Sequence, residues 1–124
     1  MKKTKVVRKS DVWIKLDGLE HIWKYFTEDR IIFSISRLLP GQSSTLDSGH
    51  KDADEICYVI SGSVVMKFPE KNYWIELNEG DAVLIAEEEP HQIINTSANE
   101  VLMVWCAAPG IGFSKKKEIE EIED

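Results

Sequence analysis

The stretch Gly49–Gly62 (GHKDADEICYVISG) is the most informative part of this sequence. It opens with a polar segment, Lys51–Asp54, and continues into an apolar run, Glu55–Ile60. Apolar, β-branched runs bounded by turn-forming residues are typical of β-strands. We therefore expect Lys51–Asp54 to form a turn, with His50 ending one strand and Glu55 beginning the next. Such a turn would bring these two side chains together.

The rest of the chain repeats this alternation of apolar runs and turn clusters. The turn clusters recur at roughly 8–10-residue intervals, which predicts an all-β protein. A chain this short protects its sheet edges by closing into a small antiparallel barrel or by folding one sheet over another. The other expected strands are Val12–Leu16, Ile31–Leu39, Ser63–Phe68, Tyr73–Leu77, Ala82–Ala86, His91–Asn95 and Val101–Ala107.

Only two segments are candidates for a helix, Leu19–Phe26 (LEHIWKYF) and Lys115–Asp124 in the charged C-terminal tail. For the tail, the alternative to a surface helix is a frayed end. The length of 124 residues fits one domain covering residues 1–124. Within it we expect a barrel at about residues 31–107, a basic tail at 1–9 and a charged tail at 114–124.

Composition limits the classes of function. The chain is 43% apolar and 30% charged, with a net charge of −7, as in a globular protein with an acidic body. Residues 1–9 carry five basic residues and no acid, so the rest of the chain sums to −12 and we expect no nucleic acid partner. No apolar run approaches the ~20 residues of a membrane span, and no apolar segment follows the basic N-terminus. We therefore expect a cytoplasmic protein that does not enter membranes.

Three residues form a candidate metal site. Two histidines and one carboxylate, His50, Glu55 and His91, suit a divalent transition metal that keeps open positions for other ligands. If Glu55 points inward, Cys57 and Val59 share its face; if His91 does, Ile93 and Asn95 share its face. The alternatives are a His50 that is solvent-facing or hydrogen-bonded, and a His91 that belongs to a turn. His21 is expected to be structural.

The segments Gly41–Gly62 and Gly80–Asn95 resemble the two motifs of the cupin superfamily. The matching residues are His50, Glu55 and Gly62 in the first motif, and Gly80, His91 and Asn95 in the second. The resemblance implies a jelly-roll barrel, or double-stranded β-helix, of the small single-domain cupin type. It also implies a divalent metal (Fe, Zn, Mn, Ni or Cu) held by inward histidines and a glutamate, and a homodimer.

The sequence departs from the cupin pattern in two places. The first histidine of the His-x-His pair is replaced, by Ser48 when counted back from His50 or by Asp47 when counted from Gly41. Asp47 can supply an oxygen ligand if the loop bends inward. The Pro-x-Gly of the second motif is replaced by residues 86–88, Ala-Glu-Glu. The opposite interpretation is a barrel that has lost its metal.

Side chains near the motifs suggest what surrounds the site. Ser34 and Ser36 alternate with apolar residues, so one strand face is partly polar and is expected to line the cavity. Cys57 is expected to be a buried thiol, with an extra soft ligand as the alternative. The aromatic residues Phe68, Tyr73, Trp74 and Trp105 are expected in the barrel core.

Two classes of function remain from the sequence. The first is a metal-dependent enzyme acting on a small polar metabolite, of oxygenase, isomerase, lyase or decarboxylase type. The second is a non-catalytic barrel that binds or senses a small molecule without metal. A third hypothesis is a purely structural dimer partner with no chemistry in its pocket. For a homodimer, Val12–Leu16 and Trp23–Phe26 offer apolar surface, although these segments can equally pack on their own barrel.

Overall fold

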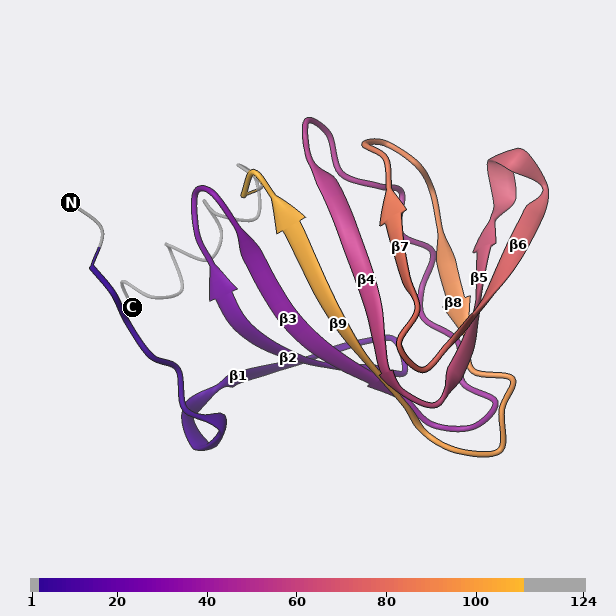
Figure 1. Cartoon of the computed structure of the whole chain (residues 1–124), viewed down its shortest axis with the longest axis horizontal. Helices are drawn as coiled ribbons and strands as arrows, with labels where there is room; N and C mark the ends of the chain where they lie inside the picture. The colour runs from indigo at the N-terminus through magenta and orange to yellow at the C-terminus, as the bar shows by residue number, and fades with distance from the viewer. Residues whose placement is uncertain (1–2, 111–124) are drawn as a thin grey trace.

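The structure is a computed structural model that describes residues 3–110. In that range the chain forms nine strands and two short 3-10 turns (Figure 1). The strands are β1 (Trp13–Asp17), β2 (Glu20–Thr27), β3 (Ile32–Leu38), β4 (Asp54–Ser61), β5 (Ser63–Phe68), β6 (Tyr73–Asn78), β7 (Ala82–Ile85), β8 (Gln92–Ile94) and β9 (Val101–Ala108), and the turns are η1 (Lys9–Asp11) and η2 (Pro69–Lys71). The expected helix at Lys115–Asp124 and the tail at 114–124 lie outside the described residues.

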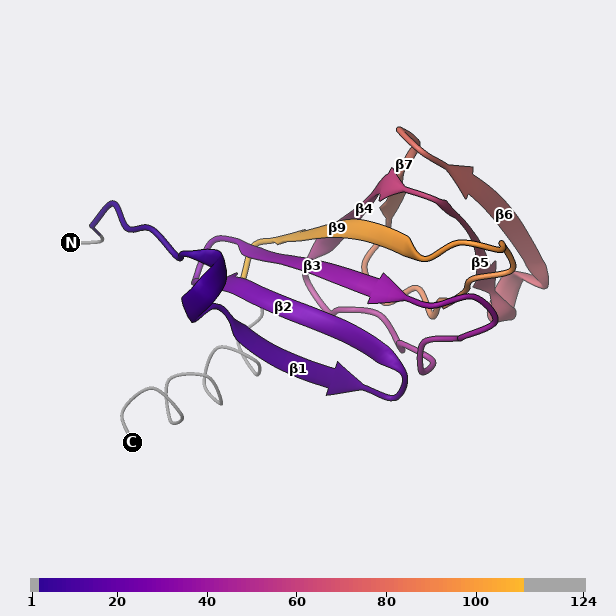
Figure 2. The same cartoon turned by 90° about the horizontal axis from the view of Figure 1, so that it is seen from below.

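The strands form two antiparallel sheets that face each other. The larger has the order β1-β2-β3-β9-β4-β7 and the smaller the order β6-β5-β8. Both views place β1 and β2 on the side of the molecule away from β5 and β6 (Figures 1 and 2). The predicted all-β, jelly-roll fold is therefore confirmed, and most predicted strands agree with the structure to within one or two residues.

The helix expected at Leu19–Phe26 is wrong, because this segment is strand β2. It pairs with β1 on one side and with β3 on the other. A short turn joins β1 and β2, in which Gly18 has a φ of +62°. Asp-Gly is a strong hairpin signal, and two neighbouring strands satisfy the backbone of β2 better than an isolated helix would.

The core lies between the two sheets and follows the alternation of the strands. In β4, Cys57 and Val59 are buried whereas Ile56 and Tyr58 are exposed. The buried cluster consists of Leu38, Cys57, Val59, Val64, Met66, Phe68, Leu77, Ile85, Ile93, Val101 and Met103. None of the helical segments in residues 3–110 has the length and apolar character needed to cross a membrane.

Two motif residues turn out to hold the fold together. Gly62, between β4 and β5, has a φ of +84°, and a Cβ there would lie 2.6 Å from the Glu100 carbonyl oxygen. Asn95 is fully buried and its Nδ2 donates to the carbonyl oxygens of Leu38 and Asn99, at 3.0 and 2.8 Å. Its Oδ1 accepts hydrogen bonds from the backbone and side chain of Ser97. Asn95 therefore ties the end of β8 to the end of β3.

Candidate metal centre

The loop between β3 and β4, residues 39–53, carries half of the site. It runs antiparallel to residues 88–95, and the backbones of Asp47 and His91 exchange two hydrogen bonds of 2.8 Å. The backbone N–H of Ser44 likewise donates to the Ile93 carbonyl oxygen at 2.9 Å. This pairing brings two segments that are distant in sequence to the same point of the barrel.

The prediction that His50 ends a strand is wrong. His50 lies in this loop, and β4 begins only at Asp54. The side chains of His50 and Glu55 do converge, but the cause is the docking of the loop on residues 88–95 and not a tight turn between two strands. The loop also bends Asp47 inward, whereas Ser48 remains exposed at the cavity.

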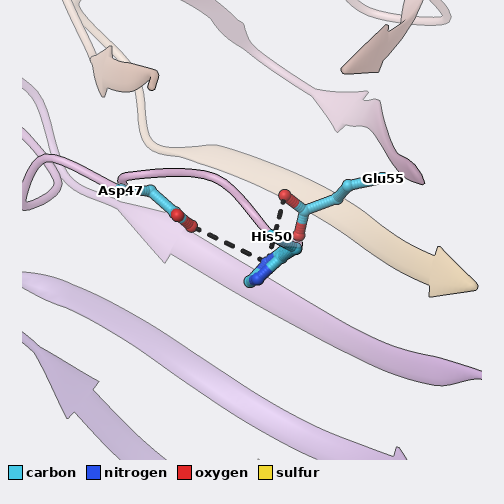
Figure 3. A group of neighbouring side chains, drawn as sticks. All are labelled: Asp47, His50 and Glu55. Carbon is cyan, nitrogen blue, oxygen red and sulfur yellow. Dashed lines mark ion pairs between the residues drawn. The ribbon is translucent and has the colours of Figure 1, made fainter. Parts of the chain in front are cut away.

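Four side chains direct donor atoms toward one small region, three of which appear in Figure 3. Glu55 Oε1 lies 3.6 Å from His50 Nε2 and 3.4 Å from His91 Nε2. Asp47 Oδ2 lies 4.0 Å from His50 Nε2 and 3.6 Å from His91 Nε2. The ligand atoms of Asp47, His50 and Glu55 all lie within 4.8 Å of one another. His91 faces this group through its contacts with Glu55 and Asp47.

These four residues fit a divalent transition metal. Nitrogen and oxygen ligands at about 2.0–2.2 Å from a common ion lie about 3–3.6 Å from one another, close to the separations observed. Glu55 Oε1 is buried and has no hydrogen-bond partner of good geometry. A buried carboxylate oxygen without such a bond is costly in a folded protein, and a cation would satisfy it.

Neighbouring groups orient two of these donors. His91 Nδ1 lies 2.9 Å from the Glu89 carbonyl oxygen, which can only accept, so Nδ1 carries the proton and Nε2 faces the cluster. Asp47 Oδ1 accepts the backbone N–H of Gly49 at 2.8 Å, which leaves Oδ2 directed at the histidines. Gly49 has a φ of +90°, and a Cβ there would lie 2.6 Å from the Glu89 backbone nitrogen.

The charges in the cluster compensate one another. The facing Glu55 carboxylate raises the pKa of His50 above its usual value. Burial alone would lower the pKa of His91, but Glu55 and the Glu89 carbonyl outweigh burial and raise it. Burial also works to raise the pKa of Glu55, yet the two imidazoles outweigh it and lower this pKa. The cluster therefore holds an ionised carboxylate beside two readily protonated imidazoles.

The cluster opens on a cavity of about 360 Å³. Its wall consists of Asp17, Glu20, Ile22, Ser34, Ser44, Thr45, Leu46, Asp47, Ser48, Gly49, His50, Glu55, His91, Ile93 and Trp105. Ser34 lines this wall as expected, and Ser36 is buried next to it, where its Oγ accepts the Trp105 indole N–H at 2.8 Å. The volume lies in the range of small-molecule sites.

The predicted strand faces are largely correct, but two aromatic predictions are wrong. Cys57 is buried, and burial raises the pKa of its thiol, as expected of a packing thiol. Phe68 lies in the core, whereas Tyr73 and Trp74 are exposed on β6. Trp105 packs against the core cluster and stacks on His91, with ring centroids 6.1 Å apart.

Asp17 and Glu20 are site residues that the sequence analysis missed. Both line the cavity from the β1–β2 hairpin, a region interpreted as partly helical. The Asp17-Gly18 turn followed by the alternation of Glu20, Ile22 and Lys24 was the available signal for an inward strand face.

Comparison with known families identifies the class of the protein. The family described as a cupin domain matches residues 34–106, which is more than half of the chain. The chain therefore belongs to the cupin family. A comparison with curated protein sequences gives no match.

Solved structures share the fold with proteins of different descriptions. A predicted oxalate decarboxylase from Thermotoga maritima has a TM-score of 0.72 and 20% identity over 85% of this chain and 99% of that chain. The polyketide cyclase RemF from Streptomyces resistomycificus has a TM-score of 0.72 and 18% identity over 89% and 82%. The cupin domain of an XRE family transcriptional regulator from Enterobacter cloacae has a TM-score of 0.66 and 23% identity over 73% and 97%. At these identities the likeness shows the fold alone.

Proposed function

We propose that this cupin binds one divalent transition metal (Fe, Zn, Mn, Ni or Cu) and acts as an enzyme on a small polar metabolite. His50, Glu55 and His91 are the proposed ligands, and Asp47 is a fourth in place of the missing histidine. The observation that carries the proposal is the buried, unsatisfied Glu55 Oε1 between two Nε2 atoms, at 3.6 and 3.4 Å. The reaction type is that of an oxygenase, isomerase, lyase or decarboxylase.

The chain's own groups have distinct tasks in such a site. When bound, the ion supplies Lewis-acid or redox chemistry. His91 keeps its proton on Nδ1, directed at the Glu89 carbonyl oxygen, so that its Nε2 is the donor. Gly49 holds one oxygen of Asp47, and the barrel wall keeps Glu55 largely away from water. The cavity beside them leaves room for a small molecule.

Metal content tests this proposal directly. The full chain, purified without an affinity tag, should contain about one metal ion per chain by mass spectrometry. Glu55→Gln and His91→Gln should each lose it, because each removes a donor while keeping a similar volume. His21→Gln is the matched control, since His21 lies away from the cavity beside Arg37 and Trp23 and should retain the metal.

Circular dichroism confirms that the variants fold before their metal content is compared. Absence of metal from the wild-type chain after soaking with each of the five ions would contradict the proposal. Equal metal content in all four proteins would contradict the ligand assignment. A bound iron would favour oxygenation, whereas zinc or manganese would favour isomerisation or elimination.

The second candidate function is a metal-free barrel that binds or senses a small molecule. One observation favours it: the carboxylates of Glu55 and Asp47 already face both imidazoles and raise their pKa values without an ion. The cupin domain of a transcriptional regulator among the similar structures is compatible with such a role. A metal-free wild-type protein that binds small molecules in its cavity would support this candidate over the enzyme.

We also propose a homodimer that forms through the outer side of the larger sheet. Strand register aligns two apolar rows there, and we call them together the outer apolar face. One row is Ile14, Trp23, Ile35, Val104 and Tyr58, and the other is Phe26, Phe33, Cys106, Ile56 and Leu84. Neither row contains a charged residue, and exposed fractions reach 43% for Tyr58 and 65% for Leu84.

The size of the outer apolar face supports a second copy as its occupant. The whole outer side of the larger sheet, of which the outer apolar face is the apolar part, presents on the order of 500 Å² per copy, because its six strands lie about 4.8 Å apart and are about 20 Å long. Two copies would then bury about 1,000 Å², the lower bound for a stable interface. The face includes part of the Trp23–Phe26 segment expected to meet a partner and extends across the whole sheet.

A further inference from the structure

Side chains of opposite charge lie at the two ends of the inner side of the β1–β2 hairpin. Asp17 pairs with Glu20 at one end, and Trp13 pairs with Lys24 at the other. In a strand every second side chain shares a face, so Glu20, Ile22 and Lys24 point the same way. The carboxylates and the lysine therefore stand at opposite ends of one inward strip, with Ile22 between them.

The strip forms one wall of two adjoining hollows. Asp17, Glu20 and Ile22 line the cavity at the metal centre. Lys15, Ile22 and Lys24 line a second hollow of about 190 Å³. The residues that line both hollows are Ile22, Ser34, His50, Glu55 and Trp105. The two hollows form a trough, and His50 and Glu55 lie where its acidic and basic halves meet.

Glu20 defines the acidic end of the trough. It is only 7% exposed, and it has Ser36 as a hydrogen-bond partner, which in turn accepts the Trp105 indole N–H. Burial raises the pKa of Glu20 to about 7, with a further increase from the nearby carboxylates. Among the described residues, neither lysine nor arginine lines this hollow. Such an environment accepts a neutral hydroxyl group and rejects an anion.

Lys15 and Lys24 define the basic end. Lys15 is exposed, and the ammonium of Lys24 lies over the Trp13 ring at 5.1 Å from its centroid. Both residues line the second hollow, and an ammonium group attracts an anion that comes close to it. An anionic group entering the trough would therefore be attracted to this end.

We propose that the trough binds a small hydroxy acid, with its carboxylate at Lys15 and Lys24 and its hydroxyl group at Glu20. The middle of the ligand then passes His50 and Glu55, and in this respect the proposal rests on the proposed function. Glu20 and Lys24 are four residues apart on one strand, or about 13 Å. This is the spacing of the two Cα atoms, and it equals the spacing of the side-chain ends if both side chains stand straight up from the strand. A hydrogen bond of about 2.8 Å at each end then leaves about 7 Å, which fits a chain of about six carbons.

Four probes with one carbon skeleton test this inference: 6-hydroxyhexanoate, hexanoate, hexane-1,6-diol and hexanedioate. Each is titrated at pH 8 into the ¹⁵N-labelled full chain and followed by amide chemical shifts. We expect 6-hydroxyhexanoate to bind about tenfold more tightly than hexanoate or the diol. Hexanedioate should bind most weakly of the three carboxylates, because its second anion faces Glu20 and Asp17.

Two variants test which end of the trough binds the hydroxyl group of the ligand and which end binds its carboxylate. Glu20→Gln should improve the binding of hexanedioate about tenfold, because the repulsion is removed. Lys24→Gln should weaken the three carboxylates and leave the diol unchanged. Lys67→Gln is the matched control, since Lys67 lies on β5 over Trp74 and lines neither hollow, and it should change nothing.

The wild-type series decides the proposal even if a variant fails to fold. Equal affinities for hexanoate and 6-hydroxyhexanoate, tight binding of hexanedioate, or no binding of any probe would each overturn it. All titrations are repeated on metal-free and metal-loaded samples. The expected order in a metal-free chain would support the hydroxy-acid trough while contradicting the metal proposal, so the two can fail separately.

Discussion

The two sides of the larger sheet differ in polarity, and near the cavity the difference is the reverse of the usual one. Around the cavity its inner side carries Glu20, Ser34, Ser36 and Glu55, whereas its outer side carries the outer apolar face. The other end of the inner side carries core residues such as Leu38, Val59 and Met103. A sheet with one solvated side ordinarily directs its apolar residues inward and its polar residues outward. The inversion around the cavity is what the proposed site on the inner side and the proposed interface on the outer side would require.

The largest expected effect comes from placing a charge on the outer apolar face. Tyr58→Glu should convert the proposed dimer into a monomer, with the dissociation constant raised by on the order of 10³-fold, because a buried unpaired carboxylate is costly. Sedimentation velocity over a concentration series measures this shift. Trp74→Glu is the control, since Trp74 is exposed on the smaller sheet and lies outside the face.

A monomeric wild-type chain at all concentrations would remove the interface explanation for the inverted sheet. A Tyr58→Glu protein that remains dimeric would show that the interface lies on another surface. In either case the apolar rows would need another explanation.

The next effect tests whether the inner polar residues hold the fold as well as the site. Asn95→Ala should destabilise the protein by about 2–4 kcal/mol, because Asn95 is buried and its loss leaves several backbone groups unpaired. Asn99→Ala is the matched control: its exposed side chain is removed while its carbonyl oxygen remains, and the expected change is within about 0.5 kcal/mol. Urea denaturation of both variants measures their free energies of unfolding. Equal destabilisation by the two substitutions would show that the effect comes from disturbing the turn after β8 and not from losing the hydrogen bonds of the Asn95 side chain.

The smallest expected effect concerns the free-energy cost of burying the ionised Glu20 carboxylate. Its pKa is raised from 4.5 in the unfolded chain to about 7, so the folded state binds this proton more tightly. Its contribution to stability is present below pH 4.5 and is lost as pH rises through 7. Glu20→Gln should therefore be more stable than wild type at pH 8 by roughly 2–3 kcal/mol.

Urea denaturation at pH 4 and pH 8 tests this expectation. The advantage of Glu20→Gln should shrink toward pH 4, where both side chains are uncharged. Glu76→Gln, on an exposed position of β6, should show the same stability as wild type at both pH values. A pH-independent difference for Glu20→Gln would show that Glu20 is solvated in the folded protein.

The strands of the barrel could be predicted because their alternation is local. The β2 strand could not, because Leu19, Ile22, Trp23 and Phe26 also follow helical spacing. Only its pairing with β1 and β3 decides that this segment is a strand and not a helix. Motif spacing was enough to predict that Glu55 and the two histidines converge, but not that the docking of the β3–β4 loop on residues 88–95 brings them together. The inward turn of Asp47 did not, since it depends on backbone pairing with His91. Glu20 was missed because it lies in the segment interpreted as helical.

The pairing of Asp47 with His91 has a thermodynamic consequence. Because segments far apart in sequence supply the donor atoms, the full set exists only in the folded chain. Any occupant of the centre therefore binds the native state selectively and raises the free energy of unfolding, by about 2.7 kcal/mol at a hundredfold excess over its dissociation constant. The melting temperature of the protein thus reports on occupancy, and a thermal screen of ions and small acids can identify ligands before any reaction is known.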